Sequence, residues 1–298
     1  MFPPKPLRQT DLLTLGDARI SRITDMDPFA LPLTFLFPGA VPEALEAHRS
    51  SLAPWHVDFA AGSVLLGVHS LLLQAGGLNI LIDTCVGACK PRPARPEWHQ
   101  RRAAGYLAAL SRAGLAPEDI DIVLCTHLHA DHVGWNTRLQ DGRWVPTFPR
   151  ARYVIGRQEL QDAASAHQAG HNHGAYADSV LPVIEAGLVQ PVDGGAELQR
   201  GMTLTPLPGH TAGQLGLALS VAGRRVLFCG DALHSPVQVH HPDWSSRFCA
   251  DPAQAARTRR TLLETVAEDA ALLVPAHLRG DLALSVRRQG DAFHPAPA

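Results

Sequence analysis

The sequence predicts an α/β fold, because short apolar strands alternate along the chain with helical segments. Residues 122–125 form an apolar run that is β-branched at its start, which is typical of a buried strand. Residues 64–73 and 78–83 are two more such runs, separated by a Gly-Gly turn, and they predict a hairpin. Residues 97–113 and 253–269 have the composition and apolar spacing of helices.

The N-terminal region, residues 1–62, is expected to be an arm followed by a long loop. Residues 1–17 are rich in proline at their start and predict an irregular arm, whereas residues 18–23 alternate like a strand. Residues 25–62 contain several prolines and a short helical piece near residues 42–50. A long irregular segment of this kind is either a functional loop or a packing arm over the sheet. Four aromatic side chains in it are candidates for an apolar substrate wall: Phe35, Phe37, Trp55 and Phe59.

The stretch from Thr126 to His132 is the most informative part of the chain. It places three imidazoles and a carboxylate directly after the strand at residues 122–125. Histidine and aspartate suit zinc, and also iron, cobalt or manganese. In so compact a turn the side chains cannot all point the same way, so His127 and His129 could bind one ion and leave Asp131 and His132 for a second. The HxHxDH pattern therefore predicts a metal site, although the chain contains 16 histidines.

Four predicted strands each end in a metal-compatible residue. Besides the strand before His127, residues 202–207 lead to His210, residues 225–229 to Asp231, and residues 271–274 to His277. A single histidine after a strand is usually only a turn residue, but four such ends that meet along one sheet edge point to a metal centre. Asp83 also closes a strand, as a turn former or as a carboxylate that orients a ligand imidazole.

Bulk composition excludes several classes of protein. The chain has 298 residues, enough to bury a large core in one or two domains. Hydrophobic residues make up 46% and charged residues 18%, as in ordinary globular proteins. The net charge is -2 with no basic stripe, so neither nucleic acid nor a membrane is an expected partner. No run approaches the ~20 apolar residues that a membrane-spanning helix needs.

Cysteine usage and the N-terminus predict a cytoplasmic protein. The five cysteines are odd in number and form no CxxC motif, which suits a reducing compartment better than a disulfide framework. Residues 1–6 lack the apolar segment of a secretory signal. At the other end, residues 291–298 are expected to form a disordered tail.

These segments resemble the metallo-β-lactamase superfamily over about residues 18–280. The HxHxDH loop is the signature of that superfamily, and Gly209-His210, Gly230-Asp231 and Ala276-His277 follow in the expected order. The resemblance implies a four-layer αβ/βα sandwich of two mixed sheets with helices outside. It also implies a single domain over residues 1–298.

The resemblance further implies a site for two divalent metal ions, with zinc favoured and manganese, cobalt or iron as alternatives. Asp231 would bridge the two ions, and the remaining six ligands divide evenly between them. The first ion would take His127, His129 and His210, and the second would take Asp131, His132 and His277.

The position three residues after Asp231 indicates a branch of the superfamily. Lactonases that cleave acyl-homoserine lactones often carry a tyrosine there, whereas this chain has His234. The histidine and the long N-terminal arm look more like the methyl parathion hydrolase branch, which includes lactonases and arylesterases. Familiar zinc β-lactamases use a cysteine ligand where this chain has Asp231, which argues against penicillin hydrolysis. Members of this branch are often homodimers, so a homodimer is an expectation from the family.

The function implied is hydrolysis of lactones or other carboxylic esters. Two ions ~3.5–4 Å apart hold a bridging hydroxide at neutral pH, and this hydroxide is the expected nucleophile. Asp131 or Asp231 would carry a proton to the leaving group. His234 would donate a hydrogen bond to the developing oxyanion, or would only support the fold.

Five other functions are alternatives to this one. Phosphotriester hydrolysis is the main alternative, because the same hydroxide would serve it. A glyoxalase II-type thioesterase would carry a basic C-terminal helical region, of which only Arg287-Arg288 is a counterpart. A nucleic-acid-processing enzyme would need a basic surface. A di-iron redox module would have a carboxylate in place of His129, and a non-catalytic scaffold would not keep the whole ligand set.

Overall fold

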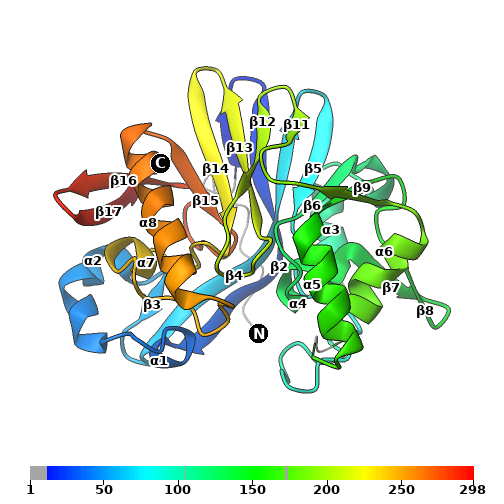
Figure 1. Cartoon of the computed structure of the whole chain (residues 1–298), viewed down its shortest axis with the longest axis horizontal. Coiled ribbons are helices and arrows are strands. Elements are labelled where there is room, and N and C mark those ends of the chain that lie inside the picture. The colour runs from blue at the N-terminus through cyan, green and yellow to red at the C-terminus, as the bar shows by residue number, and fades with distance from the viewer. Residues whose placement is uncertain (1–11, 104, 172–173) are drawn as a thin grey trace.

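The computed structural model describes residues 12–103, 105–171 and 174–298. Two β-sheets lie face to face in the middle of the molecule, with helices on the outside of each (Figure 1). The predicted four-layer αβ/βα sandwich is therefore confirmed. The part of the predicted N-terminal arm before residue 12 lies outside the described residues.

The first sheet is built from the part of the chain before residue 193. Its neighbours pair in the order β1-β2-β4-β5-β6-β9-β10, and β3 pairs with β4. The strands β5, β6 and β9 run parallel, so their carboxyl ends share one edge. Its strands are β1 (Leu12–Leu15), β2 (Ala18–Pro32), β3 (Val57–Asp58), β4 (Ser63–Ala75), β5 (Leu78–Ile82), β6 (Ile122–Cys125), β9 (Arg152–Gly156) and β10 (Val189–Val192).

The second sheet is built from the C-terminal half, in the order β11 to β17 along the chain. All neighbours are antiparallel except β14 and β15, which run parallel. Its strands are β11 (Glu197–Gln199), β12 (Met202–Pro206), β13 (Leu215–Val221), β14 (Arg224–Gly230), β15 (Leu272–Pro275), β16 (Leu284–Gln289) and β17 (Ala292–Pro297). A separate small hairpin joins β7 (Thr137–Gln140) and β8 (Arg143–Pro146).

Helices cover both outer faces: α8 lies outside the second sheet, and α3, α5 and α6 lie outside the first (Figure 1). The α-helices are α1 (Leu33–Leu36), α2 (Arg49–Leu52), α3 (Gly105–Arg112), α4 (Ala130–Val133), α5 (Arg157–Gln168), α6 (Leu181–Glu185), α7 (Val237–His240) and α8 (Pro252–Glu268). Short 3-10 turns are η2 (Pro42–His48), η3 (Pro117–Asp119) and η4 (Gly134–Asn136), and η5 (Tyr176–Val180) is a π-helical turn.

The core forms three layers because side chains alternate across each strand. On β6, Ile122 and Leu124 face the second sheet, whereas Val123 packs on the opposite face, under the helices. On the second sheet, Phe228 points between the sheets and Leu227 points toward α8. The central strands are therefore buried on both faces, which explains why β5, β6 and β15 are nearly continuous apolar runs.

Three predictions about local structure are wrong. Residues 12–15, expected to belong to an irregular arm, form strand β1, which pairs with β2. The strand that begins at Ala18 continues to Pro32, because it pairs with β4 along its whole length. The helix expected at residues 97–113 is only Gly105–Arg112. Gln100 has a φ of 48° and donates its backbone N–H to Lys90, so the chain before α3 follows a neighbouring loop instead of a helix.

The C-terminal tail is not the disordered segment that was expected. Residues Ala292–Pro297 form strand β17, which pairs antiparallel with β16 from Gln289↔Ala292 to Leu284↔Pro297. Phe293 is buried in the core under α8. The pairing with β16 and the burial of the Phe293 ring therefore order this segment, although its composition is typical of a disordered tail.

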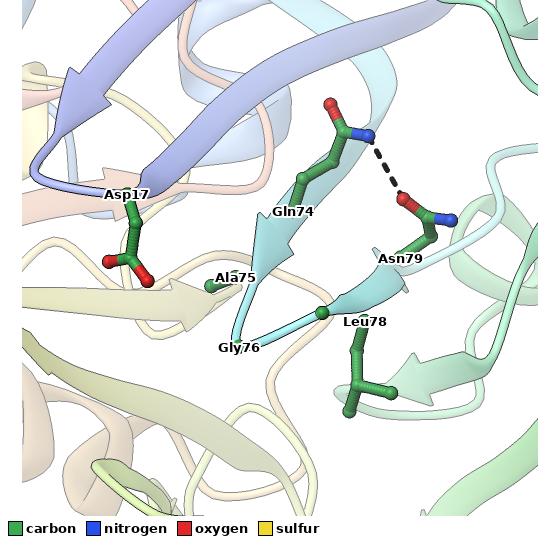
Figure 2. Close-up of a pocket in the computed structure, with 7 residues that line it drawn as sticks. Asp17, Gln74, Ala75, Gly76, Leu78 and Asn79 are labelled. Carbon is green, nitrogen blue, oxygen red and sulfur yellow. Dashed lines mark hydrogen bonds between the residues drawn. The ribbon is translucent and has the colours of Figure 1, made fainter.

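The described residues contain no helix that is both long and apolar enough to cross a membrane. Two shallow hollows lie at hairpin turns, one at β4–β5 and one at β13–β14. The first is lined by Asp17 and residues 74–79, and Gln74 donates to Asn79 across it (Figure 2). Both turns lie at the opposite strand ends from the carboxyl ends of β5, β6 and β14, where the titratable residues gather.

Candidate metal centre

The histidine-rich loop leaves β6 and turns immediately into the short helix α4. His127 is fully buried below the loop, and His129 stands just before α4. Asp131 and His132 lie within α4, and the backbone N–H of His132 donates to His129 at 3.0 Å. The turn into the helix therefore gives the first two side chains a different direction from the last two.

Three further loops bring the other candidate residues to this place. His210 follows Gly209, whose φ is 129° and whose Cβ, if present, would lie 2.3 Å from the backbone nitrogen of Ala255 in α8. Only glycine fits there, so the turn is fixed by the close approach of α8. Asp231 follows β14 and His277 follows β15, and both are buried.

Three imidazoles converge on one point. His127 Nε2 lies 3.1 Å from His129 Nδ1, and His210 Nε2 lies 2.9 Å from the same nitrogen. Three ring nitrogens around one point cannot all be paired by hydrogen bonds among themselves, since each ring nitrogen is either a donor or an acceptor. A metal cation between them would use all three lone pairs.

A second group lies beside the first. The ligand atoms of Asp131, His132 and His277 lie within 4.8 Å of one another. His277 Nε2 is 3.8 Å from an oxygen of Asp131, and His132 Nε2 is 3.9 Å from the other. These distances leave room between the atoms, as a cation site requires.

Asp231 stands between the two groups. One of its oxygens, Oδ2, is 3.3 Å from His210 Nε2 and 3.4 Å from His132 Nε2, while Oδ1 is 3.2 Å from His277 Nε2. The carboxylate thus reaches both groups at once. All seven residues that the resemblance named lie in this one cluster.

The residues present fit divalent metal ions. His132 Nε2 and Asp231 Oδ1 are buried, and neither has a hydrogen-bond partner among the described residues. Buried polar atoms without partners are costly, and at such a cluster they fit the ligand atoms of a bound cation. The donor set, five imidazoles and two carboxylates, is the chemistry that zinc and similar ions prefer.

The electrostatics of the cluster are consistent with this use. Burial and the neighbouring imidazoles lower the pKa of His127 well below its ordinary value, and burial does the same to the pKa of His210. Burial also lowers the pKa of His132, but the carboxylates of Asp231 and Asp83 outweigh it and raise that pKa well above the ordinary value. Burial raises the pKa of Asp231, yet the imidazoles around it hold that pKa well below its usual range. A bound cation would replace protons held here.

Side chains outside the cluster orient it. Asp83 accepts a hydrogen bond from His132 Nδ1 at 2.9 Å and also accepts from the backbone and hydroxyl of Thr126. This contact with His132 supports the predicted orienting role of Asp83, which stays a prediction. Glu159 was not predicted: its carboxylate accepts from the backbone of Leu128 and of Gly213, which ties the loop before α4 to the loop after His210. A single glutamate at the start of a helix gives no sequence signal that it will bind the backbone of two distant loops.

His234 lies against the same cluster. Its Nε2 is 3.2 Å from Asp231 Oδ2, its backbone N–H donates to Gln238, and both ring nitrogens are buried without hydrogen-bond partners among the described residues. The ring of Phe37 meets it edge-on at 6.4 Å. Among the other aromatic candidates, Phe35 faces Phe248, whereas Trp55 lies under Arg279 and Phe59 under Arg49.

Comparison with known proteins agrees with this architecture. A probable metallo-hydrolase of Mycobacterium tuberculosis is 26% identical over 220 residues, 68% of each chain. The N-acyl homoserine lactonase AiiB of Agrobacterium fabrum is 26% identical over 191 residues, 58% of this chain and 65% of the relative.

Two solved structures share the fold. A hydrolase of the β-lactamase superfamily, AbOPH, has a TM-score of 0.80 at 23% identity over 99% of each chain. The dizinc quorum-quenching lactonase AidC has a TM-score of 0.77 at 22% identity over 96% of each chain. The model of the metallo-β-lactamase superfamily itself matches residues 64–277, a span that holds all seven clustered residues. The chain therefore belongs to the metallo-β-lactamase superfamily.

Proposed function

We propose that this superfamily hydrolase uses two divalent metal ions, zinc in the first place, to cleave lactones or other carboxylic esters. One observation supports it above the rest: loops from both sheets bring seven side chains that can bind a metal, together with His234, into one largely buried cluster. The proposed ligands are His127, His129 and His210 for one ion, Asp131, His132 and His277 for the other, and Asp231 for both.

Bound divalent ions supply a hydroxide at neutral pH and polarise the carbonyl of an ester. The protein's own part is to hold its ligands rigidly, since a site misplaced by about 1 Å loses much of its rate. Asp83 and Glu159 do this, because each is buried and accepts hydrogen bonds from the loop that carries the first four ligands.

His234 is the proposed hydrogen-bond donor to the oxygen on which negative charge develops. Its ring nitrogens have no partner among the described residues, and its place beside Asp231 puts a donor next to the reacting centre. Gln238 holds its backbone, and the edge of Phe37 limits the movement of its ring. Asp131 is the proposed proton carrier to the leaving group, because its side chain is 19% exposed whereas Asp231 is buried.

The test combines metal analysis with a substrate panel. Purified protein should contain close to two divalent ions per chain. The panel contains acyl-homoserine lactones, simple lactones, aryl esters, paraoxon-type phosphotriesters and nitrocefin, and we expect lactones or carboxylic esters to have the highest kcat/KM. Cleavage of nitrocefin alone would overturn the proposal. A clear preference for phosphotriesters would replace it with phosphotriester hydrolysis, the main alternative.

A further inference from the structure

We propose that Arg95 and Arg247 bind a carboxylate borne by the substrate away from its scissile bond, so that the enzyme prefers anionic esters or lactones. The proposal rests on the proposed function and names the substrate class of that site. It concerns a group of side chains that we call the arginine rim: Arg95, Arg247, Phe35 and Phe248.

The two guanidiniums of the rim both lie near one aromatic ring. Arg247 lies 4.0 Å and Arg95 lies 5.4 Å from the centroid of Phe35, and Arg95 lies at the same 5.4 Å from Phe248. The rings of Phe35 and Phe248 meet at 6.2 Å in an edge-to-face pair. A guanidinium near a ring face is attracted to it, and stacking there leaves the in-plane N–H groups free for a planar anion.

Neither guanidinium has an anionic partner among the described residues. Across residues 12–103, 105–171 and 174–298, no carboxylate lies within 4.0 Å of either, and neither side chain donates a hydrogen bond. Arg92 and Arg101, on the same loop as Arg95, pair with Asp178 and Asp25 instead. Two positive charges that both lie near one ring and have no anionic partner among the described residues attract a carboxylate that binds beside them.

The arginine rim is adjacent to the metal cluster. The backbone of Arg247 donates to Leu36, next to Phe37, whose ring meets His234. Two residues further on, Cys249 Sγ lies 3.6 Å from His210 Nδ1, and the N–H of Ala250 donates to the carbonyl of His210. The segment from Arg247 therefore runs directly from the rim to a proposed metal ligand.

The loop of Arg95 is anchored before any substrate binds. Arg92 makes two hydrogen bonds to Asp178, at 2.6 and 2.8 Å, and the fully buried Lys90 donates to the carbonyl of Asp178 at 2.8 Å. The guanidinium of Arg95 lies 5.7 Å from the centroid of the Trp98 ring, and Trp98 in turn packs against Phe29. A charge held in place in this way loses little entropy when it binds an anion.

The experiment compares two esters of equal chain length, 4-nitrophenyl pentanoate and mono-4-nitrophenyl glutarate, which carries a terminal carboxylate. We expect a higher kcat/KM for the glutarate, chiefly through KM, and a preference that weakens as salt is added. R247Q and R95Q should each lower the ratio of the two kcat/KM values roughly tenfold, as for loss of one charge-assisted pair. R247K, which keeps the charge but not the planar fork, should restore part of the preference.

The matched control is Arg143→Gln, an exposed arginine on β8 outside the rim, which should leave the ratio unchanged. A wild-type ratio near one, or a ratio that R247Q and R95Q do not alter, would overturn the inference while leaving the proposed function intact. Failure to hydrolyse either ester or any lactone would instead count against the proposed function. Circular dichroism and Tm of each variant separate a lost anion site from a lost fold, and R247K tests the inference if R247Q is unstable.

Discussion

At the scale of single residues, His234 has the most ambiguous position in the site. It lies close enough to His210 and Asp231 to be counted as a ligand itself, and it also lies beside Asp231, where our proposal places the reacting ester. A ligand, a donor to the substrate and a supporting side chain would all be buried at this place. The three roles differ in what is lost when the ring is removed.

Replacing His234 with alanine should lower kcat by about 10²-fold, the usual effect of removing one donor to a developing oxyanion. The metal content should stay at the wild-type value, because seven ligands remain. Steady-state kinetics and metal analysis of the same preparation measure both. The exposed His171→Ala serves as the control. Loss of an ion from the H234A protein would identify His234 as a ligand or as a support for one.

Asp83 acts on the site only through its neighbours. The substitution Asp83→Asn keeps the size of the side chain but removes the charge that the ring of His132 faces at 2.9 Å. We expect metal affinity to fall about 10- to 100-fold, as for other residues that orient a metal-bound imidazole. Competition with a chromophoric chelator measures it. Unchanged affinity in D83N, matched by an unchanged Asp162→Asn control on the exposed face of α5, would show that Asp83 is only a turn former.

At the scale of elements, the C-terminal strand contributes more to the stability of the fold than its composition suggests. Strand β17 completes the second sheet, and Phe293 is 2% exposed beneath α8. Replacing Phe293 with alanine should lower the free energy of unfolding by about 3–5 kcal/mol, the cost of emptying a buried aromatic site. Chemical denaturation measures it, with the exposed Ala292→Ser on the same strand as control. A change below 1 kcal/mol would mean that the tail adds little to the core.

A second histidine cluster joins three elements that are distant in the sequence. His48 ends η2, His240 and His241 follow each other at the end of α7, and His294 lies in β17. The rings of His48 and His240 are stacked at 3.7 Å, and Ser51 Oγ lies 3.1 Å from His240 Nε2. Burial, together with these neighbouring imidazoles, lowers the pKa of His240 to about 3.

This cluster should make the protein less stable in acid. A histidine whose pKa is lowered by folding binds fewer protons in the folded than in the unfolded chain, so stability falls as the pH drops below the unfolded value of about 6.5 toward 3. His240→Asn should reduce the slope of Tm against pH between 6.5 and about 4.5. His171→Asn, outside the cluster, controls for general loss of a histidine. Equal slopes in H240N and the wild type would contradict the expectation.

At the scale of the whole molecule, the metal cluster connects the two sheets. Its residues come from the carboxyl ends of β6, β12, β14 and β15, so an ion bound there joins loops that otherwise contact each other through imidazoles and carboxylates. The apolar layer between the sheets is one cluster, which includes Ile122 from the first sheet and Val274 from the second. This shared core supports our proposal that the chain forms one domain.

Removing the metal should therefore lower the thermal stability of the whole molecule. An ion present at about 1,000 times its dissociation constant stabilises the folded state by about 4 kcal/mol, and a chelator abolishes this. We expect Tm to fall by several degrees with a chelator and to recover with zinc. Differential scanning fluorimetry measures it, and an identical Tm with and without chelator would show that the cluster binds no ion. The expected cytoplasmic location and homodimer stay predictions.

Much of the fold followed from patterns confined to a few neighbouring residues. Apolar runs predicted the strands that end before His127, His210, Asp231 and His277, because burial on both faces requires such runs. The helix predicted at residues 97–113 was too long, since the loop that holds Gln100 is shaped by its contact with Lys90. Residues that act across the fold, such as Glu159, were missed because hydrogen bonds to distant backbone leave no local pattern.

The sequence by itself determined the kind of fold, the chemistry of the cluster and the residues that could form it, because strand periodicity and ligand types are local properties. Only the tertiary structure decided that the seven side chains form one cluster with Asp231 between its two groups, that His234 joins them, and that Arg95 and Arg247 share the ring of Phe35. These are distances between segments far apart in the chain. They depend on how two sheets pack face to face, and the spacing of residues along the chain does not encode them.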